Sequence, residues 1–430
     1  MQPISKIING RRVIVKKPEL LAPAGNLEKL KTAIIYGADA VFIGGKEFSL
    51  RSQASNFSIE DIKEAVQFAN QYGAKIHVTC NIILHHDNLE GIKEYLQALD
   101  DAGVTAIIVA DPYIMNLAKS MDLKLEVHVS TQMSVTNSSA VKFFEDMGMD
   151  RVVLGRETTF ADLKDIRKNA PDIDLEYFIH GAMCISYSGR CMLSNYYSRR
   201  DANRGGCSQS CRWYYDLEEN GQSINEDFPF TMSSKDMCLI HHIGELIECG
   251  VDSFKIEGRM KSVHYIATVV STYRKLIDTY CADPDHFADS KKYEDELQKA
   301  ANRAFCHGFF YDNPGVDEQL YNLRDEHPTQ EFVMRVLDYD KDSKRAKIEQ
   351  RNYFKVGDKI EIFSPSHSNI YFTVDKIYNE DNELVEVANH PMEILYVEID
   401  YPVLENDMGR KVNHGKYSWH YWDCRWKCFW

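Results

Sequence analysis

Residues 18–45 read PELLAPAGNLEKLKTAIIYGADAVFIGG, which is two short apolar runs separated by a longer segment. In that segment the apolar residues recur at the spacing of one helix face. A strand, a helix and a second strand in this order form a parallel pair, because the crossover helix returns the chain to the end of the sheet where it began. The stretch therefore predicts a β-α-β unit.

The same alternation of apolar runs and helical segments continues to about residue 260. Several of the helical segments end on glycine, as helix carboxyl termini often do. Eight strands in this arrangement close into a (β/α)8 TIM-like barrel, and the alternative is an open doubly wound sheet. The predicted strands lie at residues 18–25, 40–45, 74–81, 106–111, 125–130, 151–157, 175–181 and 253–259.

The chain changes character on both sides of this pattern. Period-two alternation after residue 331 predicts a small antiparallel β-barrel domain. The tail carries four of the five tryptophans, so it is either an aromatic segment that stacks on RNA bases or a non-native extension. The expected parts are an arm (1–16), the barrel (17–280) with an inserted Cys-rich loop region (181–240), a helical linker (281–330), the β-domain (331–412) and the tail (413–430).

Composition bounds the class of protein. No apolar run reaches the roughly 18 residues of a membrane-spanning helix, and the N-terminus lacks the apolar core of a secretion signal. We therefore expect no membrane contact and a cytoplasmic location. A net charge of −15 argues against attraction of nucleic acid by the whole surface. A local basic patch is still available between residues 177 and 215, with Arg190, Arg199, Arg200, Arg204 and Arg212.

Five of the eleven cysteines are clustered, at positions 184, 191, 207, 211 and 238. In a reducing compartment such thiols stay free or bind metal. Zinc sites usually contain two close cysteine pairs, and only Cys207 and Cys211 form one. A nucleophilic cysteine needs a base, which His180 offers to Cys184. An iron–sulfur cluster needs four thiolates on a pliable loop. Spacing alone leaves these three interpretations open.

The segment EYFIHGAMCISYSGRCMLS, residues 176–194, resembles the signature of the collagenase-like peptidase family, peptidase U-32. Other blocks resemble the same family in the same order, so the resemblance covers roughly residues 17–412 and excludes the tail. These blocks are the opening strand–helix–strand, RDANRGGCSQSCRW (200–213), SSKDMCLI (233–240), DSFKIEGRMKS (252–262) and NDMGRK (406–411).

The resemblance implies more than proteolysis. Some members of the family were labelled proteases, and others act in oxygen-independent hydroxylation of RNA or quinone precursors with an iron–sulfur cluster. The chain length is similar to the tRNA-hydroxylation branch, which implies formation of 5-hydroxyuridine at the wobble position of tRNA, with prephenate as hydroxyl donor. The implied ligands of a [4Fe-4S] cluster are Cys184, Cys191, Cys207 and Cys238, with Cys211 as an alternative.

Two other functions stay open: a collagenase-like peptidase, and a non-catalytic partner of a hydroxylase, as a paired family member. The sequence contains neither an HExxH helix nor a G-x-S-x-G elbow, which disfavours two common protease mechanisms. A cysteine protease would leave most of the clustered thiols unused.

Residues that end the predicted strands are candidates for the chemistry. His180 and Glu257 are possible acid/base groups, although His180 could equally be a core histidine. Arg156, Arg259 and, less well placed, Lys255 could bind the carboxylates of a dicarboxylate such as prephenate. Glu257, Arg259 and His180 are the predicted catalytic residues.

Charged and aromatic residues alternate in the Cys-rich loop, as in proteins that bind single-stranded RNA. An unpaired anticodon base is cheap to extrude into a pocket. The alternative is that the arginines pair only with the cluster and with Asp201 or Asp216. The predicted tRNA-contacting residues are Arg199, Arg200, Arg204, Arg212 and Trp213, with Tyr196 and Tyr197 beside them, and together with Arg156 these arginines and Trp213 are the predicted substrate residues.

Overall fold

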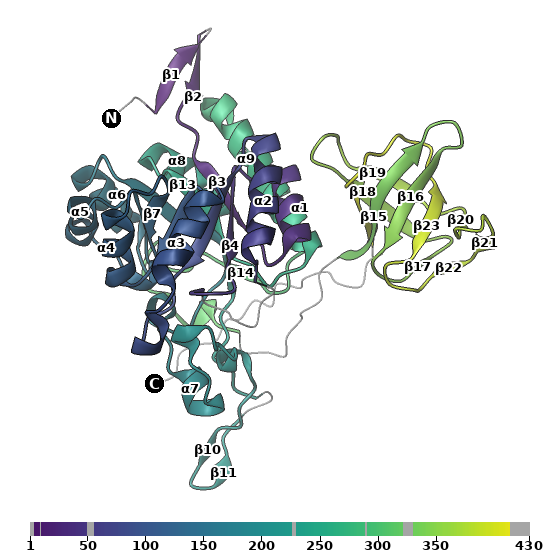
Figure 1. Cartoon of the computed structure of the whole chain (residues 1–430). Coiled ribbons are helices and arrows are strands. Elements are labelled where there is room, and N and C mark those ends of the chain that lie inside the picture. The colour runs from purple at the N-terminus through teal and green to yellow at the C-terminus, as the bar shows by residue number, and fades with distance from the viewer. Residues whose placement is uncertain are drawn as a thin grey trace. The chain divides into compact units, whose positions relative to one another are not determined.

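The computed structural model describes residues 4–8, 10–49, 56–225, 229–288, 290–320 and 330–412. The chain forms two compact units (Figure 1). The first lies within residues 1–326, apart from residues 298–300, and the second comprises residues 298–300 and the chain from residue 327. The aromatic tail, residues 413–430, lies outside the described residues.

The first unit is a closed parallel barrel. Strand β13 pairs in parallel with both β3 and β9, which joins the two ends of the strand series into a ring. The predicted (β/α)8 barrel is thereby confirmed, and the open-sheet alternative is wrong, because an open sheet would leave two strand edges unpaired. The barrel strands are β3 (Glu19–Pro23), β4 (Ala40–Gly44), β5 (Lys75–Cys80), β6 (Ala106–Val109), β7 (Glu126–Val129), β8 (Arg151–Val153), β9 (Asp174–Ala182) and β13 (Ser253–Ile256).

Helices surround this barrel (Figure 1). Most begin at a side chain that accepts a backbone N–H, as Ser58 and Thr159 do in capping boxes, which fixes where each helix starts. The helices are α1 (Leu27–Ile35), α2 (Ile59–Tyr72), α3 (Ile92–Asp101), α4 (Pro112–Ser120), α5 (Ser138–Asp146), α6 (Phe160–Asn169), α8 (Ile243–Cys249), α9 (Val263–Ala282) and α10 (Lys291–Gln298). None of the described helices combines the length and apolar character that a membrane span requires.

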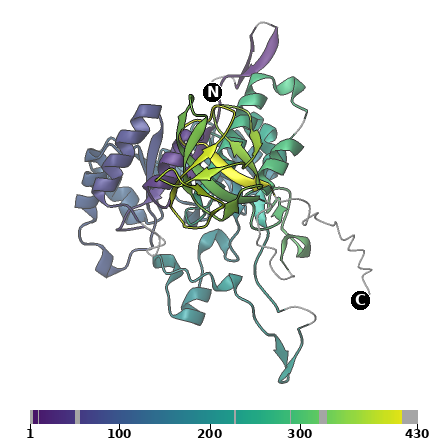
Figure 2. The same cartoon turned by 90° about the vertical axis from the view of Figure 1, so that its right-hand side faces the viewer.

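The Cys-rich segment separates the seventh barrel strand from the eighth, as the sequence predicts. It contains α7 (Leu193–Ser198), the hairpin β10 (Glu218–Glu219) and β11 (Gln222–Ser223), and β12 (Asp236–Cys238). Strand β12 pairs antiparallel with β9 and parallel with β14 (Phe305–Cys306). Figures 1 and 2 show α7 and the β10–β11 hairpin at one end of the barrel. A second hairpin, β1 (Ser5–Ile8) and β2 (Arg11–Ile14), lies at the opposite end.

The second unit is antiparallel, which confirms the predicted β-domain. Its main sheet has eight strands in the order β19-β18-β24-β15-β16-β23-β20-β21. Apolar residues such as Val333, Ile348 and Val397 form its core. The strands are β15 (Gln330–Asp340), β16 (Arg345–Gln350), β17 (Phe354–Lys355), β18 (Lys359–Phe363), β19 (Ile370–Thr373), β20 (Ile377–Tyr378), β21 (Leu384–Val385), β22 (Val387–Ala388), β23 (Ile394–Glu398) and β24 (Met408–Val412).

One buried ion pair lies in this β-domain. Arg410 Nε donates to Glu361 Oε2 at 3.1 Å, and both side chains are fully buried. Lys299 Nζ lies 2.9 Å from Glu361 Oε1. Burial opposes ionisation of the carboxyl, but the charges and hydrogen bonds of Arg410 and Lys299 outweigh it and lower the pKa of Glu361 to about 2. The carboxylate is therefore a structural group of the domain.

Candidate functional site

A cavity of about 520 Å³ opens at the carboxyl ends of the barrel strands, beneath the Cys-rich segment. Phe42, Thr79, Ile108, Phe178 and Lys255, each from a different barrel strand, contribute to its wall. TIM-barrel enzymes build their active sites at this end of the barrel. The volume is that of a pocket for a small organic molecule.

Four thiols line this cavity, those of Cys184, Cys191, Cys207 and Cys211. Cys184 lies two residues after the end of β9, whereas the other three come from the turns around α7. The backbone φ is positive at Gly189 and Gly205, at 77° and 96°, which lets the chain reverse direction between the cysteines. The local turns thus bring four thiols that are up to 27 residues apart in the chain to the lining of one cavity.

Cys238, predicted as the fourth ligand, is not in this group. It lies in β12 opposite His180 of β9, its residue is 5% exposed, and its Sγ is 3.7 Å from Tyr273 Oη. Pairing of β12 with the barrel wall directs the thiol into the packing against α9 and not into the cavity. Cys238 therefore does not line the cavity, whereas Cys211, which the sequence offered as an alternative ligand, does.

Two of the cavity thiols, those of Cys184 and Cys211, resist ionisation by themselves. Burial raises the pKa of Cys184 and of Cys211, and the neighbouring cysteines add to the effect, while Arg156 and Arg212 oppose it. Thiolates that repel one another become stable together when they bind metal, which displaces their protons. Four thiols that line one cavity match in number the donor set of a structural zinc ion or of an iron–sulfur cluster, and that number does not choose between them.

The cavity is strongly cationic. Among the described residues that line it, six side chains are cationic and one, Glu257, is a carboxylate. Clefts lined by one sign of charge concentrate ligands of the opposite sign. We conclude that the cavity suits a small anion. The cationic residues are Arg156, Arg212, Lys255, Arg259, Lys261 and Arg303.

Three predicted residues lie together in this cavity. Arg156 Nη2 is 3.0 Å from Glu257 Oε2, and the Arg156 guanidinium lies 3.8 Å from the centroid of the Phe178 ring. Arg259 is 4% exposed and donates to Asn56 Oδ1 at 2.9 Å. A Cβ at Gly44 would lie 2.0 Å from Arg259 Nη2, so glycine is required there to seat the guanidinium.

His180 lies elsewhere. It is 1% exposed, and its ring packs against Tyr265, Tyr273 and Phe305 outside the cavity lining. A β-bulge shifts the register between β9 and β13 at this point, which re-aims the side chain. Burial lowers the pKa of His180 to about 4. The predicted acid/base role for His180 is therefore not supported by its position, and the core-histidine alternative describes it.

The loop arginines differ in exposure. Arg199 is exposed, and Arg200 is half-buried and donates to the Cys207 carbonyl at 3.4 Å. Arg204 pairs with Asp87 at 3.0 Å, not with the predicted Asp201 or Asp216. Arg212 is 8% exposed and donates to Ser233 Oγ and to the Met183 and Ser234 carbonyls, so it cannot act as the surface RNA contact that the sequence predicted.

The outer face of the Cys-rich segment is aromatic. Tyr196, Tyr197 and Trp213 are 83%, 45% and 42% exposed. The rings of Tyr196 and Tyr197 are 5.2 Å apart, and Tyr215 lies 5.3 Å from Tyr197. A cluster of exposed apolar rings on a globular protein usually marks an interaction surface.

Two cavity cations were not predicted from the sequence, Lys261 and Arg303. Both pair with buried Asp236, through Lys261 Nζ at 3.6 Å and Arg303 Nη1 at 2.9 Å. Burial raises the pKa of Asp236, but the two cations outweigh it and lower the pKa overall. Lys261 could have been found, since it follows Glu257 and Arg259 at spacings of two residues, whereas Arg303 reaches the site from a distant part of the chain.

Two family models match the chain in succession. The model described as peptidase family U32 matches residues 25–320, and the one described as the peptidase family U32 C-terminal domain matches residues 328–410. The chain belongs to peptidase family U32. This assignment confirms the resemblance seen in the motif around Cys184 and Cys191.

Relatives of this U32 chain carry different names. The tRNA hydroxylation protein P1 of Bacillus subtilis (strain 168) is 52% identical over 414 residues, which cover 95% of this chain and 98% of that protein. The 23S rRNA 5-hydroxycytidine C2501 synthase of Escherichia coli is 42% identical over 261 residues, 60% of this chain and 39% of that protein. A collagenase of Porphyromonas gingivalis is 31% identical over 305 residues, 68% of this chain and 73% of that protein.

Proposed function

We propose that this chain is an RNA-modifying enzyme that hydroxylates the wobble uridine of tRNA to 5-hydroxyuridine without molecular oxygen. The observation that carries the proposal is one cavity that combines four thiols and six cationic side chains beneath an exposed aromatic surface. Peptide hydrolysis does not require these three features in combination. The name of the Bacillus subtilis relative, similar over almost its whole length, supports the same activity.

The thiols supply the cofactor part of the proposal. We assign Cys184, Cys191, Cys207 and Cys211 as the residues that would hold a [4Fe-4S] cluster. When bound, such a cluster supplies electron-transfer chemistry beside the cavity. Arg156 and Arg212 lie close enough to lower the pKa of Cys184 and Cys211, respectively. The positive charge of these two arginines would also offset the negative charge of a tetrathiolate centre.

The cationic side chains that line the cavity support the second part of the proposal, the binding of the hydroxyl donor. A dicarboxylate such as prephenate, the proposed hydroxyl donor, would neutralise two of the cations that line the cavity. Arg259 and Arg303 are held by Asn56 and Asp236, so their guanidinium groups are oriented before the ligand arrives. Pre-oriented forks bind carboxylates with two parallel hydrogen bonds.

Glu257 is the acid/base group of the proposal. It is the only carboxylate among the cavity residues, and Arg156 fixes its orientation through the 3.0 Å contact. Hydroxylation at a base carbon requires loss of a proton from that carbon, and a carboxylate at the cavity wall can accept it. Glu257 therefore takes the role that the sequence analysis divided between it and His180.

The aromatic surface completes the proposal, because the target uridine must enter the cavity. Tyr196, Tyr197 and Trp213 offer ring faces on which neighbouring bases can stack, and Arg199, which follows α7 in the chain, is exposed as well. Bases of the anticodon loop are unpaired, so extruding one costs little free energy. The surface thus suits single-stranded RNA beside the cavity mouth.

The name of the Porphyromonas gingivalis relative favours one second candidate, a collagenase-like peptidase. That function needs an activated nucleophile, and the nearest predicted base, His180, is buried away from the cavity thiols. The arrangement therefore favours the hydroxylase. A non-catalytic partner of a hydroxylase is the third possibility and is separated by the experiment below.

The test uses two samples. One is full-length protein purified without oxygen, and the other is tRNA from cells whose own gene for this protein is deleted and that are supplied with either the wild type or a variant. Iron and sulfide per chain, the visible spectrum and 5-hydroxyuridine per tRNA are measured. Wild type should contain a cluster and restore the nucleoside, and Cys191→Ser should lose both. The control Cys249→Ser removes a half-buried thiol outside the cavity and should change neither.

Each contrary result has a distinct meaning. Protein without iron under nitrogen would refute the cluster. A cluster without restored 5-hydroxyuridine would indicate the non-catalytic partner. Peptide cleavage that survives Cys191→Ser would favour the peptidase.

A further inference from the structure

The barrel interior holds a second group of potential ligands, one layer below the cavity. His77 of β5, His128 of β7 and Glu176 of β9 are all completely buried. Because side chains alternate along a strand, each lies two residues before a residue that lines the cavity: Thr79, Ser130 and Phe178. One ligand atom of each of the three residues lies within 4.8 Å of the others.

The two histidines have ring nitrogens without hydrogen-bond partners. Neither His77 Nδ1 nor His77 Nε2, nor His128 Nδ1, has one among the residues that the structure describes. The two rings meet edge to face, with centroids 4.9 Å apart. Buried polar atoms in folded proteins nearly always have a partner, so this pattern indicates that a bound species completes the site.

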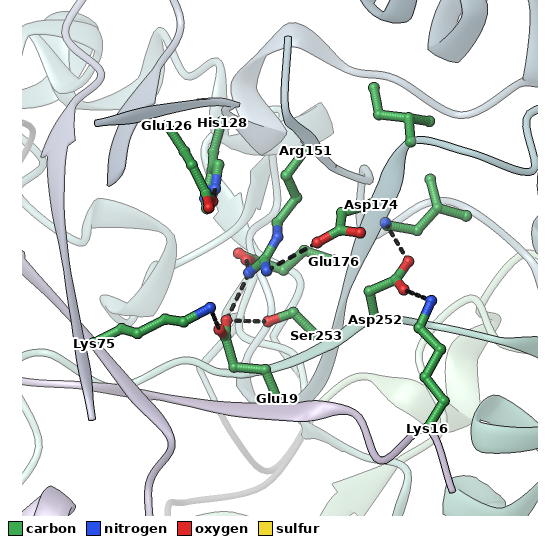
Figure 3. A network of polar contacts seen from close by, with 12 residues as sticks. Lys16, Glu19, Lys75, Glu126, His128, Arg151, Asp174, Glu176, Asp252 and Ser253 are labelled. Carbon is green, nitrogen blue, oxygen red and sulfur yellow. Dashed lines mark hydrogen bonds and ion pairs between the residues drawn. The ribbon is translucent and has the colours of Figure 1, made fainter. Parts of the chain in front are cut away.

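His128 is oriented as metal-binding histidines are. Its Nε2 is 2.8 Å from Glu126 Oε2, which leaves Nδ1 as the atom for a ligand (Figure 3). A carboxylate on the far nitrogen fixes the tautomer and orientation of the ring and raises its basicity as a ligand. Burial also lowers the pKa of His77 to about 4, so its ring is neutral, which is the form that binds metal.

We propose that His77, His128 and Glu176 bind a divalent transition-metal ion of the zinc class inside the barrel. Two imidazole nitrogens and one carboxylate are a donor set that zinc accepts. Ligand bonds of about 2.0–2.2 Å would require the three side chains to draw together slightly. The site shares no residue with the thiol group, so it does not depend on the proposed RNA hydroxylation.

The surrounding charges set the strength of binding. Glu176 also accepts from Lys255 Nζ at 2.6 Å and from Arg151 Nη1 at 3.2 Å. Arg151 in turn binds Glu19 at 2.6 Å (Figure 3). A carboxylate has lone pairs for a metal as well as for these donors. The two cations oppose a metal ion while Glu19 and Glu176 favour it, so we expect micromolar rather than tighter affinity.

The test must separate this site from the four thiols. Full-length protein with Cys184, Cys191, Cys207 and Cys211 all changed to Ser is freed of metal and titrated with Zn²⁺ in a calorimeter. X-ray absorption at the zinc edge then identifies the first-shell atoms. We expect one zinc per chain with nitrogen and oxygen ligands only, and no such zinc after the further change His77→Phe.

Two further variants distinguish a loss of zinc binding from a loss of the fold. Glu126 is 42% exposed in its side chain, so Glu126→Gln should fold, and it should weaken zinc binding about 10-fold through His128. The control His242→Gln removes another histidine–carboxylate pair, with Glu245 at 2.8 Å, and should leave binding unchanged.

Absence of a nitrogen/oxygen zinc at millimolar Zn²⁺ would overturn the proposal. An affinity that neither His77→Phe nor Glu126→Gln reduces would do the same. If the fourfold serine variant does not fold, the wild type replaces it. The proposal then requires that His77→Phe lower the zinc content by one ion per chain and remove the nitrogen/oxygen shell.

Discussion

Arg156 donates to Glu257 across the mouth of the barrel, with Nη2 and Oε2 3.0 Å apart. The contact joins the segment after β8 to the segment after β13, which are 101 residues apart in the chain. It places the one carboxylate found among the described cavity residues against a cation, and so fixes the orientation of the proposed acid/base group.

Glu257→Gln should abolish most of the proposed activity. The amide keeps a contact with Arg156 but cannot accept a proton, and general acid–base catalysis typically contributes about 100-fold or more. We expect at least that loss in the rate of 5-hydroxyuridine formation, measured by nucleoside mass spectrometry, with little change in melting temperature. A variant as fast as wild type would remove Glu257 from the mechanism.

Cys211→Ser and Cys238→Ser should differ in their effect on iron content, although each change removes one thiol near the barrel. Cys211 lines the cavity, so its loss should lower iron and sulfide per chain in protein purified without oxygen. Cys238 packs against Tyr273, so its loss should leave iron unchanged and reduce the melting temperature. Iron lost only from Cys238→Ser would restore the ligand set inferred from the sequence.

Tyr196→Ala should weaken tRNA binding without harming the fold, because the ring is 83% exposed. Stacking on one base is worth about 1–3 kcal/mol, so we expect roughly a 10-fold increase in Kd. Binding is measured by fluorescence anisotropy with labelled anticodon stem-loop. Tyr72→Ala, which removes a ring that is 56% exposed on α2, is the matched control. Equal effects of the two changes would argue against a specific stacking surface.

The first unit should lose stability as the pH falls from 6.5 to 4. Burial lowers the pKa of both His77 and His180 from 6.5 to about 4 in the folded chain. Within this range the unfolded chain therefore binds protons that the folded chain excludes, and the free energy of unfolding decreases as the pH is lowered. Calorimetric melting at several pH values should show this slope, and His180→Phe should make it shallower. An unchanged slope in the variant would mean that His180 titrates normally in the folded state.

The barrel could be predicted because its signals are local. Each strand is a short apolar run, and each helix carries its period and often its terminal glycine within about 15 residues. The family signature supplied the thiols, and the strand ends supplied Arg156, Glu257 and Arg259.

The sequence could not show in which direction a given side chain points. Spacing treats Cys211 and Cys238 alike, and only the pairing of β12 with β9 shows that Cys238 points away from the cavity. For His180 the sequence left an acid/base role and a core position equally open, and the bulge beside it, which has no sequence signal here, accompanies its burial outside the cavity. Arg303 reaches the cavity from 67 residues beyond Asp236, a contact that no local pattern encodes.

The ring of strands has a consequence for synthesis. Strand β13 closes it by pairing with β3, whose residues lie 234 positions earlier in the chain. The four cavity thiols precede β13, so they leave the ribosome before the ring can close. Contacts between such distant segments form slowly, because much chain must be brought together first. Each newly made molecule therefore passes through a period in which its cysteines are already translated, while the cationic side chains on and after β13 are not yet in place.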